Sequence, residues 1–193
     1  GALFTIAPWV FMFLIPAVTM RLFAEENRTG TIEQLLTKPL TDLNIISAKY
    51  LAGVILVVFS LLPTLVYFAS IYFLGSPKGN IDQGGMWGSY LGLLFLAAGF
   101  VAIGLFSSSL SDNQVIAFII AVFLSFFCFI GFDFLGSLGL FGSLDLVIIK
   151  LGISEHYSSM SRGVIDSRDA LYFLSLIGLF FMLTKLKLAS RNW

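Results

Sequence analysis

Few side chains in this sequence have the types and spacing that catalysis or metal binding requires. His156 is the one histidine, and it stands between Glu155 and Tyr157, where an imidazole could titrate or bind a ligand. A hydrogen-bonded loop residue is the simpler interpretation of a lone histidine. A metal site needs several ligands of suitable type and spacing, and none accompanies His156, so the sequence predicts no metal.

Asp133 is a second candidate, because it lies between Phe132 and Phe134 near the end of a long apolar run. An ionisable side chain inside a membrane span is a functional candidate by default. The alternative is a carboxylate that hydrates, since it lies within a turn of the expected membrane interface. Asp133 and His156 are thus candidates for residues of a transport path or an outer gate.

Motifs for catalysis are absent from the sequence. It contains no G-x-x-x-x-G-K-[ST], no H-E-x-x-H and no G-x-S-x-G, and it therefore predicts no P-loop for ATP phosphates and no catalytic residue. The one cysteine, Cys128, excludes an intramolecular disulfide. On these grounds we do not expect the chain to be an enzyme.

Composition assigns the chain to the membrane proteins. Hydrophobic residues make up 58% and charged residues 11%, and the mean hydropathy is +0.97. A soluble domain carries about 25% charged residues, so this chain is too apolar to have a solvated surface. The net charge is zero and no long basic tract occurs, which argues against nucleic acid as a partner.

The apolar runs predict an all-α fold, a polytopic bundle of five membrane-spanning helices. A membrane helix needs about 20 mainly apolar residues, and in lipid its backbone polar groups must be satisfied within the helix. The predicted spans are Leu3–Met20, Tyr50–Leu74, Met86–Phe106, Gln114–Leu135 and Ala170–Thr184. A turn is expected at Ser107–Asn113, and Pro8, Pro16 and Pro63 are expected to bend their helices.

A long connector, residues 136–169, separates the last two spans. Within it Leu144–Ile153 is apolar, but it is interrupted by charged residues and is too short to cross a membrane. We expect this stretch to form an interfacial or re-entrant helix on the outer face. The chain then returns to the membrane, where Asp166 or Ser167 could cap the last span.

Basic residues are divided unequally between the two sides of the predicted bundle. The segment between the first two spans and the C-terminal tail together hold Arg21, Arg28, Lys38, Lys49, Lys185, Lys187 and Arg191. The opposite side holds Lys78, Lys150, Arg162 and Arg168, spread over many more residues. Because Lys and Arg accumulate on the cytoplasmic side, the first segment and the C-terminus are predicted to be cytoplasmic.

The polar segment Arg21–Thr41, which joins the first two spans, carries the densest local signals. Thr31 and Gln34 match a capping box, Gly30 permits a sharp turn before them, and Pro39 ends the predicted short helix. The apolar face of this helix comprises Ile32, Leu35 and Leu36. A second helix is expected to begin at Thr41 or Asp42 and to run into the next span.

Acidic residues accompany this short helix, since Glu25 and Glu26 precede it and Glu33 lies within it. Helices that rest on lipid head groups favour Lys and Arg on the polar face. The acids therefore favour a surface that docks into a basic groove of a protein, and an interfacial helix on lipid is the alternative.

The stretch EENRTGTIEQLLTKPLT resembles the E-E-x-x-x-G-T-[IL]-E-x-L-L-[ST]-x-P-[IL]-[ST] signature of ABC-2 type transporter permeases. The match is carried by Glu25, Glu26, Gly30, Thr31, Ile32, Glu33, Leu35, Leu36, Thr37, Pro39, Leu40 and Thr41. AKYLAG after the signature and HYSSMSRGVIDSRDALYF before the last span extend the resemblance. Over essentially its whole length, the chain is most similar to gliding-motility ABC transporter permeases of Bacteroidetes (GldF type).

The resemblance implies one ABC-2 type transmembrane domain over residues 1–193, with a cytoplasmic coupling region at 21–49 and an outer connector at 136–169. Contacts to an ATPase would be made by Glu25, Glu26, Gly30, Thr31, Ile32, Glu33, Leu35, Leu36 and Pro39. Members of the family have six spans, and the run before the coupling region corresponds to the second. We therefore expect the first span of the family to be absent from this sequence.

The implied function is that of a multi-pass permease subunit in the bacterial inner (cytoplasmic) membrane. It would couple ATP hydrolysis by a separate ABC ATPase to export or transport, in association with gliding motility. The partner would bind ATP, so no cofactor is expected in the chain itself. The expected partners are the ATPase, a second permease subunit in a homo- or heterodimer, and the lipid bilayer. The alternatives are a non-transporting scaffold of a motility or secretion complex and a fragment of a secondary transporter.

Overall fold

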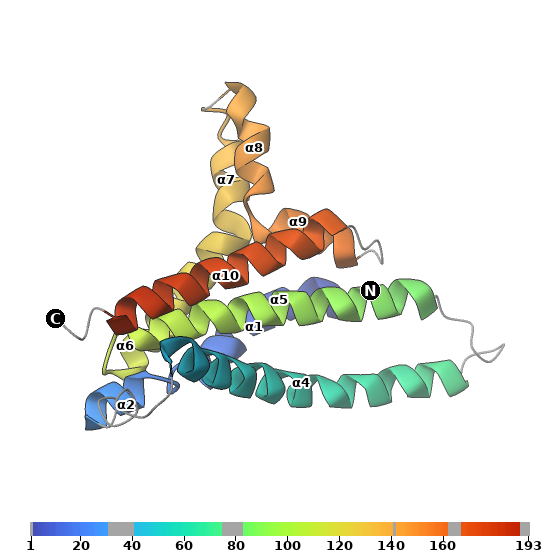
Figure 1. The fold of residues 1–193 in the computed structure, drawn as a ribbon. Helices are drawn as coiled ribbons and strands as arrows, with labels where there is room; N and C mark the ends of the chain where they lie inside the picture. The colour runs from blue at the N-terminus through green and yellow to red at the C-terminus, as the bar shows by residue number, and fades with distance from the viewer. Residues whose placement is uncertain (1, 31–40, 75–82, 141, 162–166, 190–193) are drawn as a thin grey trace.

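The computed structural model describes residues 2–30, 41–74, 83–140, 142–161 and 167–189, and within these ranges all regular structure is helical. The prediction of an all-α polytopic bundle is confirmed (Figure 1). The α-helices are α1 (Ala2–Thr19), α2 (Ala24–Thr29), α4 (Asp42–Leu74), α5 (Gln83–Ser109), α6 (Gln114–Phe126), α7 (Phe132–Ser137), α8 (Asp145–Lys150), α9 (Ile153–Ser161) and α10 (Ser167–Ala189). A π-helical turn η1 (Phe127–Gly131) and a 3-10 turn η2 (Gly142–Leu144) complete the set.

Four helical segments of the described chain are long and apolar enough to cross a membrane. They are Leu43–Pro63, Trp87–Ser109, Gln114–Ser137 and Ser167–Ala189, and a shorter apolar helix covers Ile6–Thr19. Each predicted span thus has a helix at its position. The helix at the third predicted span continues to Ser109, so the predicted turn at Ser107 begins too early. The buried hydroxyls of Ser107 and Ser109 are satisfied within this helix, because they donate to the carbonyls of Ile103 and Phe106.

The helix α4 joins two predicted elements into one. It begins at Asp42, and Thr41 caps it, because the Thr41 hydroxyl accepts a hydrogen bond of 3.1 Å from the Asn44 amide. A helix of 33 residues is about 50 Å long at 1.5 Å per residue. This exceeds the hydrocarbon thickness of about 30 Å, so α4 extends beyond the hydrocarbon.

The centre of the bundle is α5, which contacts α1, α4, α6, α9 and α10 (Figure 1). Within its apolar segment 72% of the residues are buried, against 22% in each of the other three long segments. Its side chains Leu93, Leu96, Phe100 and Ile103 are fully or almost fully buried. The outward faces of the surrounding helices remain apolar, as expected of helices that contact lipid.

Small residues on both sides of α5 interfaces let the backbones approach closely. A Cβ added to Gly104 would lie 2.8 Å from the Cβ of Thr19 on α1, and one added to Gly53 on α4 would lie 2.8 Å from Val101 Cγ1. The same holds for Gly92, whose Cβ would lie 2.9 Å from the Cβ of Met160 on α9. Close packing of this kind drives helix association in lipid, where no hydrophobic effect acts between helices.

The fourth span differs from a simple helix at its outer end. After α6 the chain makes the π-helical turn η1, continues as α7 and reverses at Gly139 and Gly142, whose φ values are 67° and 62°. The helices α7 and α8 pair as a hairpin that stands away from α5 and α10 (Figure 1). We did not predict this π-helical turn from the sequence.

The single interfacial helix predicted for Leu144–Ile153 is wrong in its extent. The structure has a 3-10 turn up to Leu144, the short helix α8, and a break at Leu151 and Gly152 before α9 begins at Ile153. Gly152 packs against α7 and η1, since a Cβ there would lie 3.2 Å from Phe132 Cβ. The chain turns at this contact, so the apolar stretch is divided between two helices.

Replacement of Gly104 by Ala is expected to destabilise the bundle. The new methyl group would overlap Thr19, whose Cβ belongs to the rigid part of α1, and overpacking of this kind costs about 1–3 kcal/mol. The measurement is the temperature at which half of the detergent-solubilised protein loses its monodisperse elution. Gly178→Ala is the matched control, because no atom lies within 4 Å of the added Cβ. Equal midpoints for the two variants would contradict the close approach of α1 and α5.

Candidate functional site

The described part of the predicted coupling region contains a helix that we did not predict. Glu25 and Glu26 lie on α2, and Gly30 comes directly after it with a φ of 79°. Glycine adopts this left-handed conformation without strain and is the usual residue just beyond a helix C-terminus, so the chain turns sharply there. The sequence signal for α2 was available, since AEENR consists mostly of helix-forming residues before a glycine.

The remaining residues predicted to contact an ATPase lie outside the described residues. They are Thr31, Ile32, Glu33, Leu35, Leu36 and Pro39. The predicted amphipathic helix with its capping box therefore stays a prediction. The structure describes the elements on either side of this stretch, with α2 before it and Thr41 and the start of α4 after it.

The junction between α1 and α2 is held by one hydroxyl group of α5. Ser108 Oγ accepts hydrogen bonds of 2.8 Å and 3.0 Å from the amides of Phe23 and Ala24, and it donates one of 3.0 Å to the carbonyl of Met20. The first amides of a helix have no partner within the helix, and Phe23 at the N-cap offers no side-chain acceptor. Ser108 thus caps α2 from a different helix.

A small apolar cluster surrounds this junction. Phe23 and Ala24 are completely buried. Phe23 packs with Ile45 and Ile46 of α4, Leu105 of α5 and Leu188 of α10. The residue at the N-cap of α2 therefore belongs to one apolar cluster with three long helices of the bundle.

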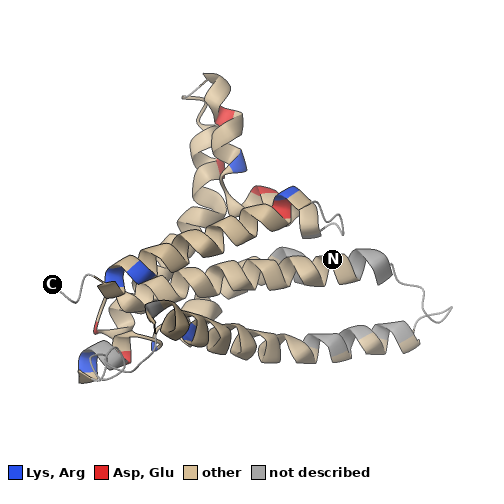
Figure 2. Ribbon diagram, viewed as in Figure 1, with Lys and Arg blue, Asp and Glu red and all other residues tan. Residues whose placement is uncertain are grey.

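Two cations line the same junction. The Lys49 ammonium donates a hydrogen bond of 2.5 Å to the carbonyl of Leu22 and lies 5.0 Å from the ring centroid of Phe23. A cation over an aromatic face is stabilising. Arg21 Nε donates to Gln114 Oε1 at 3.2 Å, which links the end of α1 to the start of α6. Basic residues, drawn in blue in Figure 2, lie on α2 and on the last turns of α10 at this end of the bundle.

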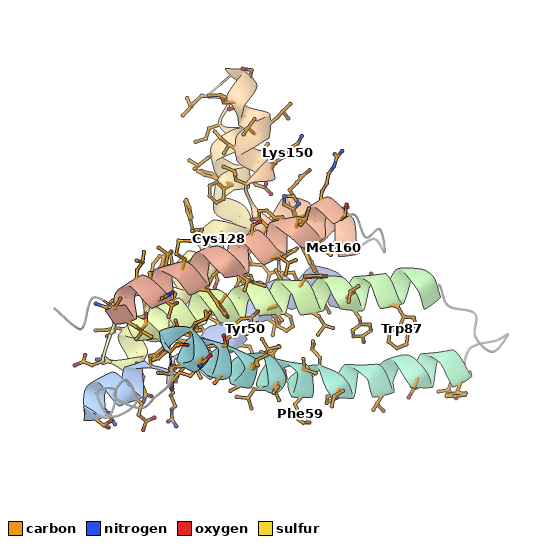
Figure 3. The ribbon with its side chains drawn as sticks, viewed as in Figure 1. Tyr50, Phe59, Trp87, Cys128, Lys150 and Met160 are labelled. Carbon is orange, nitrogen blue, oxygen red and sulfur yellow. The ribbon has the colours of Figure 1, made fainter. Side chains whose placement is uncertain are left out.

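The simpler interpretation of His156 was a hydrogen-bonded residue in a loop. The structure places His156 on the helix α9 and not in a loop, but its side chain is hydrogen-bonded as expected. Its Nδ1 lies 2.7 Å from Asp169 Oδ1 and its Nε2 lies 2.8 Å from the carbonyl oxygen of Lys150. The imidazole is stacked on Tyr172, with ring centroids 3.9 Å apart. The helix α9 packs through Ile153 and Met160 on the central helix, and Figure 3 labels Met160 at that contact.

Asp133 lies on α7, within the outer hairpin. It is half-buried, and its Oδ1 is buried with no hydrogen-bond partner in the part of the chain that the structure describes. No interaction between Asp133 and His156 is present among the described residues. The two candidate path residues therefore do not form one polar site.

Two apolar grooves lie beside α4. One of about 260 Å³ lies between α1, α4 and α5, and one of about 180 Å³ lies between α4 and α5. Their walls are almost wholly apolar, and Ser60 and Tyr90 contribute hydroxyl groups to them. Among the described residues no group of three or more His, Cys, Asp or Glu side chains could hold a metal ion.

Comparison with models of known protein families assigns the chain to one family. Residues 1–151 match the model of a family described as ABC-2 family transporter protein. The chain belongs to this family, and it is a multi-pass membrane protein and a permease subunit of an ABC transporter. Subunits of this kind are not themselves catalytic, and their partners are an ABC ATPase and the membrane lipid. A comparison with curated proteins found no match.

Replacement of Ser108 by Ala is expected to loosen the base of the coupling region. It leaves the buried amides of Phe23 and Ala24 without their acceptor, and an unsatisfied buried group costs about 1–3 kcal/mol. Amide hydrogen exchange over residues 20–30 should accelerate about fivefold or more, as measured by mass spectrometry.

Ser107→Ala is the matched control, because Ser107 is equally buried but its hydroxyl bonds only within α5, to the carbonyl of Ile103. It should leave exchange over residues 20–30 unchanged. If both variants exchange as the wild type does, Ser108 does not anchor the junction.

Proposed function

We propose that the coupling region, residues 21–49, is the docking surface of this permease for its ABC ATPase subunit. The observation that supports the proposal is the anchoring of α2. Ser108, Phe23 and Lys49 connect its base to α4, α5 and α10 through hydrogen bonds and buried apolar contacts. A short segment that is joined to several long helices can pass a rigid-body displacement to them.

The chemistry of this surface favours a basic groove on the partner. Glu25 and Glu26 lie on α2, and Glu33 comes later in the sequence. A surface that rests on anionic lipid would carry mainly Lys and Arg. In the proposed complex the ATPase binds ATP, so the permease itself needs no cofactor, and it contributes no catalytic residue.

The orientation is inferred from the clustering of basic residues at one end of the bundle. Leu188 near the end of α10 packs with Phe23, so the C-terminal lysines and the coupling region lie at the same end (Figure 2). Lys and Arg accumulate on the cytoplasmic side of membrane proteins. We place this end in the cytoplasm and the α7–α8 hairpin toward the outer side, in the inner membrane of a bacterium.

The finer assignment rests on the resemblance of the sequence to gliding-motility permeases of Bacteroidetes. It supports a transporter of this type that acts in association with gliding motility, with two permease subunits and two ATPases. Residues 1–193 then form one transmembrane domain with the outer connector at 136–169. The helices α1 and α4, which flank the coupling region, would carry its displacement into the membrane.

Charge reversal in the coupling region is expected to weaken binding of the ATPase. Glu33→Lys and Glu26→Lys place a cation against the proposed basic groove, and close charge pairs at interfaces contribute about 1.5 kcal/mol or more. Binding should therefore weaken at least about tenfold. The measurement is titration of the purified permease with the ABC ATPase that co-purifies with the wild type from its native membranes.

Glu155→Lys, an exposed reversal on α9 at the other end of the bundle, is the control and should bind the ATPase normally. Gly30→Pro tests the backbone, because proline requires a φ near −65° and Gly30 has 79°. Gly139→Pro, with a φ of 67° in the outer hairpin, is its control. The docking proposal is wrong if the coupling variants bind and stimulate the ATPase as the wild type does. Co-purification of the wild type only with proteins lacking ATPase activity would instead favour a scaffold.

A further inference from the structure

Both ring nitrogens of His156 face oxygen atoms, and both oxygens are hydrogen-bond acceptors when Asp169 is ionised. Nδ1 lies 2.7 Å from a carboxylate oxygen of Asp169, and Nε2 lies 2.8 Å from the backbone carbonyl of Lys150. A neutral imidazole has one N–H, whereas an imidazolium has two. Both bonds with an ionised Asp169 therefore require a protonated His156. The separation of 2.7 Å is typical of a charge-assisted bond between N⁺–H and a carboxylate.

The burial of Asp169 makes this proton important for the local structure. Asp169 is 7% exposed, and its second oxygen is buried with no hydrogen-bond partner among the described residues. The ion pair with His156 is the charge compensation that the structure shows for it. A buried carboxylate that loses its cationic partner is strongly destabilising.

The cluster joins three helices of the outer connector. The carbonyls of Lys150 and Leu151 lie at the C-terminal end of α8, where carbonyls have no partner within the helix. His156 of α9 donates to the first, and the hydroxyl of Tyr172 of α10 donates to the second at 2.6 Å. The imidazole lies flat on the Tyr172 ring, with an interplanar angle of 13°, and a cation in this position is stabilised by the aromatic face.

We propose that His156, Asp169 and Tyr172 form a proton-binding clasp, which holds α8 and α9 to α10 while His156 is an imidazolium and releases them when the proton leaves. The ligand of this site is a proton from the solvent at the end of the bundle opposite the coupling region. As the pH rises through the titration of the ring, one nitrogen loses its hydrogen and one of the two acceptors loses its donor. The clasp is therefore closed at low pH and loosens at high pH. The proposal does not depend on the docking of an ATPase.

The other ionisable side chains around His156 do not replace its proton. Lys150, Glu155 and Arg168 are exposed, so water and salt screen their charges. Burial raises the pKa of the Tyr157 phenol, which stays neutral. The remaining ionisable groups on the elements that pack against α9 near this site are Asp145 of α8, Cys128 of η1, Tyr90 of α5 and Tyr172 of α10.

The protonation state of His156 can be measured directly, because it is the one histidine of the chain. The experiment uses the full chain with ¹⁵N-labelled histidine, purified without a histidine tag and placed in lipid nanodiscs. We expect both ring nitrogens to carry hydrogen at neutral pH, because each faces a hydrogen-bond acceptor when Asp169 is ionised. A bare Nδ1 at neutral pH overturns the proposal.

Two variants assign the source of this protonation. Asp169→Asn removes the carboxylate charge and should lower the fraction of His156 that carries hydrogen on both ring nitrogens at neutral pH, whereas Glu155→Gln removes an exposed charge next to His156 and should leave this fraction unchanged. An equal fraction in Asp169→Asn and in the wild type also overturns the proposal. If Asp169→Asn fails to fold, the protonation of the ring in the wild type and in Glu155→Gln still decides between the two outcomes.

A distance measurement tests the release of the outer helices. Spin labels at Val147→Cys on α8 and Leu171→Cys on α10, both exposed positions, are introduced together with Cys128→Ser. Below the midpoint of the ring we expect one narrow distance, and above it a broad distribution, which His156→Asn shows at every pH. The same narrow distribution on both sides of the midpoint shows that the clasp does not release the hairpin and overturns the proposal.

Discussion

The close packing of α5 against its neighbours is the constraint on which the rest of the structure depends. In lipid, association of helices relies on van der Waals contact. The helix α5 comes close to α1 at Gly104 and to α9 at Gly92, and Gly53 of α4 lets α4 come close to α5. Because α5 is buried among the helices that surround it, the elements at both ends of the bundle take their positions from it.

The polar site at the coupling region and the polar cluster around His156 lie at opposite ends of the bundle, and both are positioned by α5. Ser108 near the end of α5 caps α2, and Met160 of α9 packs onto Gly92 of the same helix. The helix α10 reaches both sites, since Leu188 packs with Phe23 in the coupling region and Asp169 binds His156 in the outer cluster. With 23 residues it is about 34 Å long, so one straight element contacts the two ends of the molecule.

Much of the fold could be predicted from the sequence, because membrane helices carry a strong local signal. Runs of apolar residues predicted the positions of the long apolar helices among the described residues, and α4 was predicted to begin at Thr41 or Asp42, where the Thr41 hydroxyl caps it. The helices α2 and α9 were missed. Both are short and polar, and although AEENR favours a helix at α2, tertiary contacts stabilise both helices. Ser108 caps the first, and burial of Ile153 and Met160 against α5 stabilises the second. The division of the connector at Gly152 and the π-helical turn also depend on contacts between segments distant in sequence.

By itself the sequence determined that the chain is an all-α membrane protein, and it contained the resemblance to ABC-2 permeases that the family match at residues 1–151 bears out. Hydropathy is sufficient to recognise the membrane-protein class and a local motif to recognise the family, because both depend only on residues that are neighbours in the sequence. Only the tertiary structure decided that Ser108 holds the base of the coupling region and that His156 faces Asp169 and the end of α8. These contacts join residues of different helices, and the direction of each side chain depends on how the helices pack.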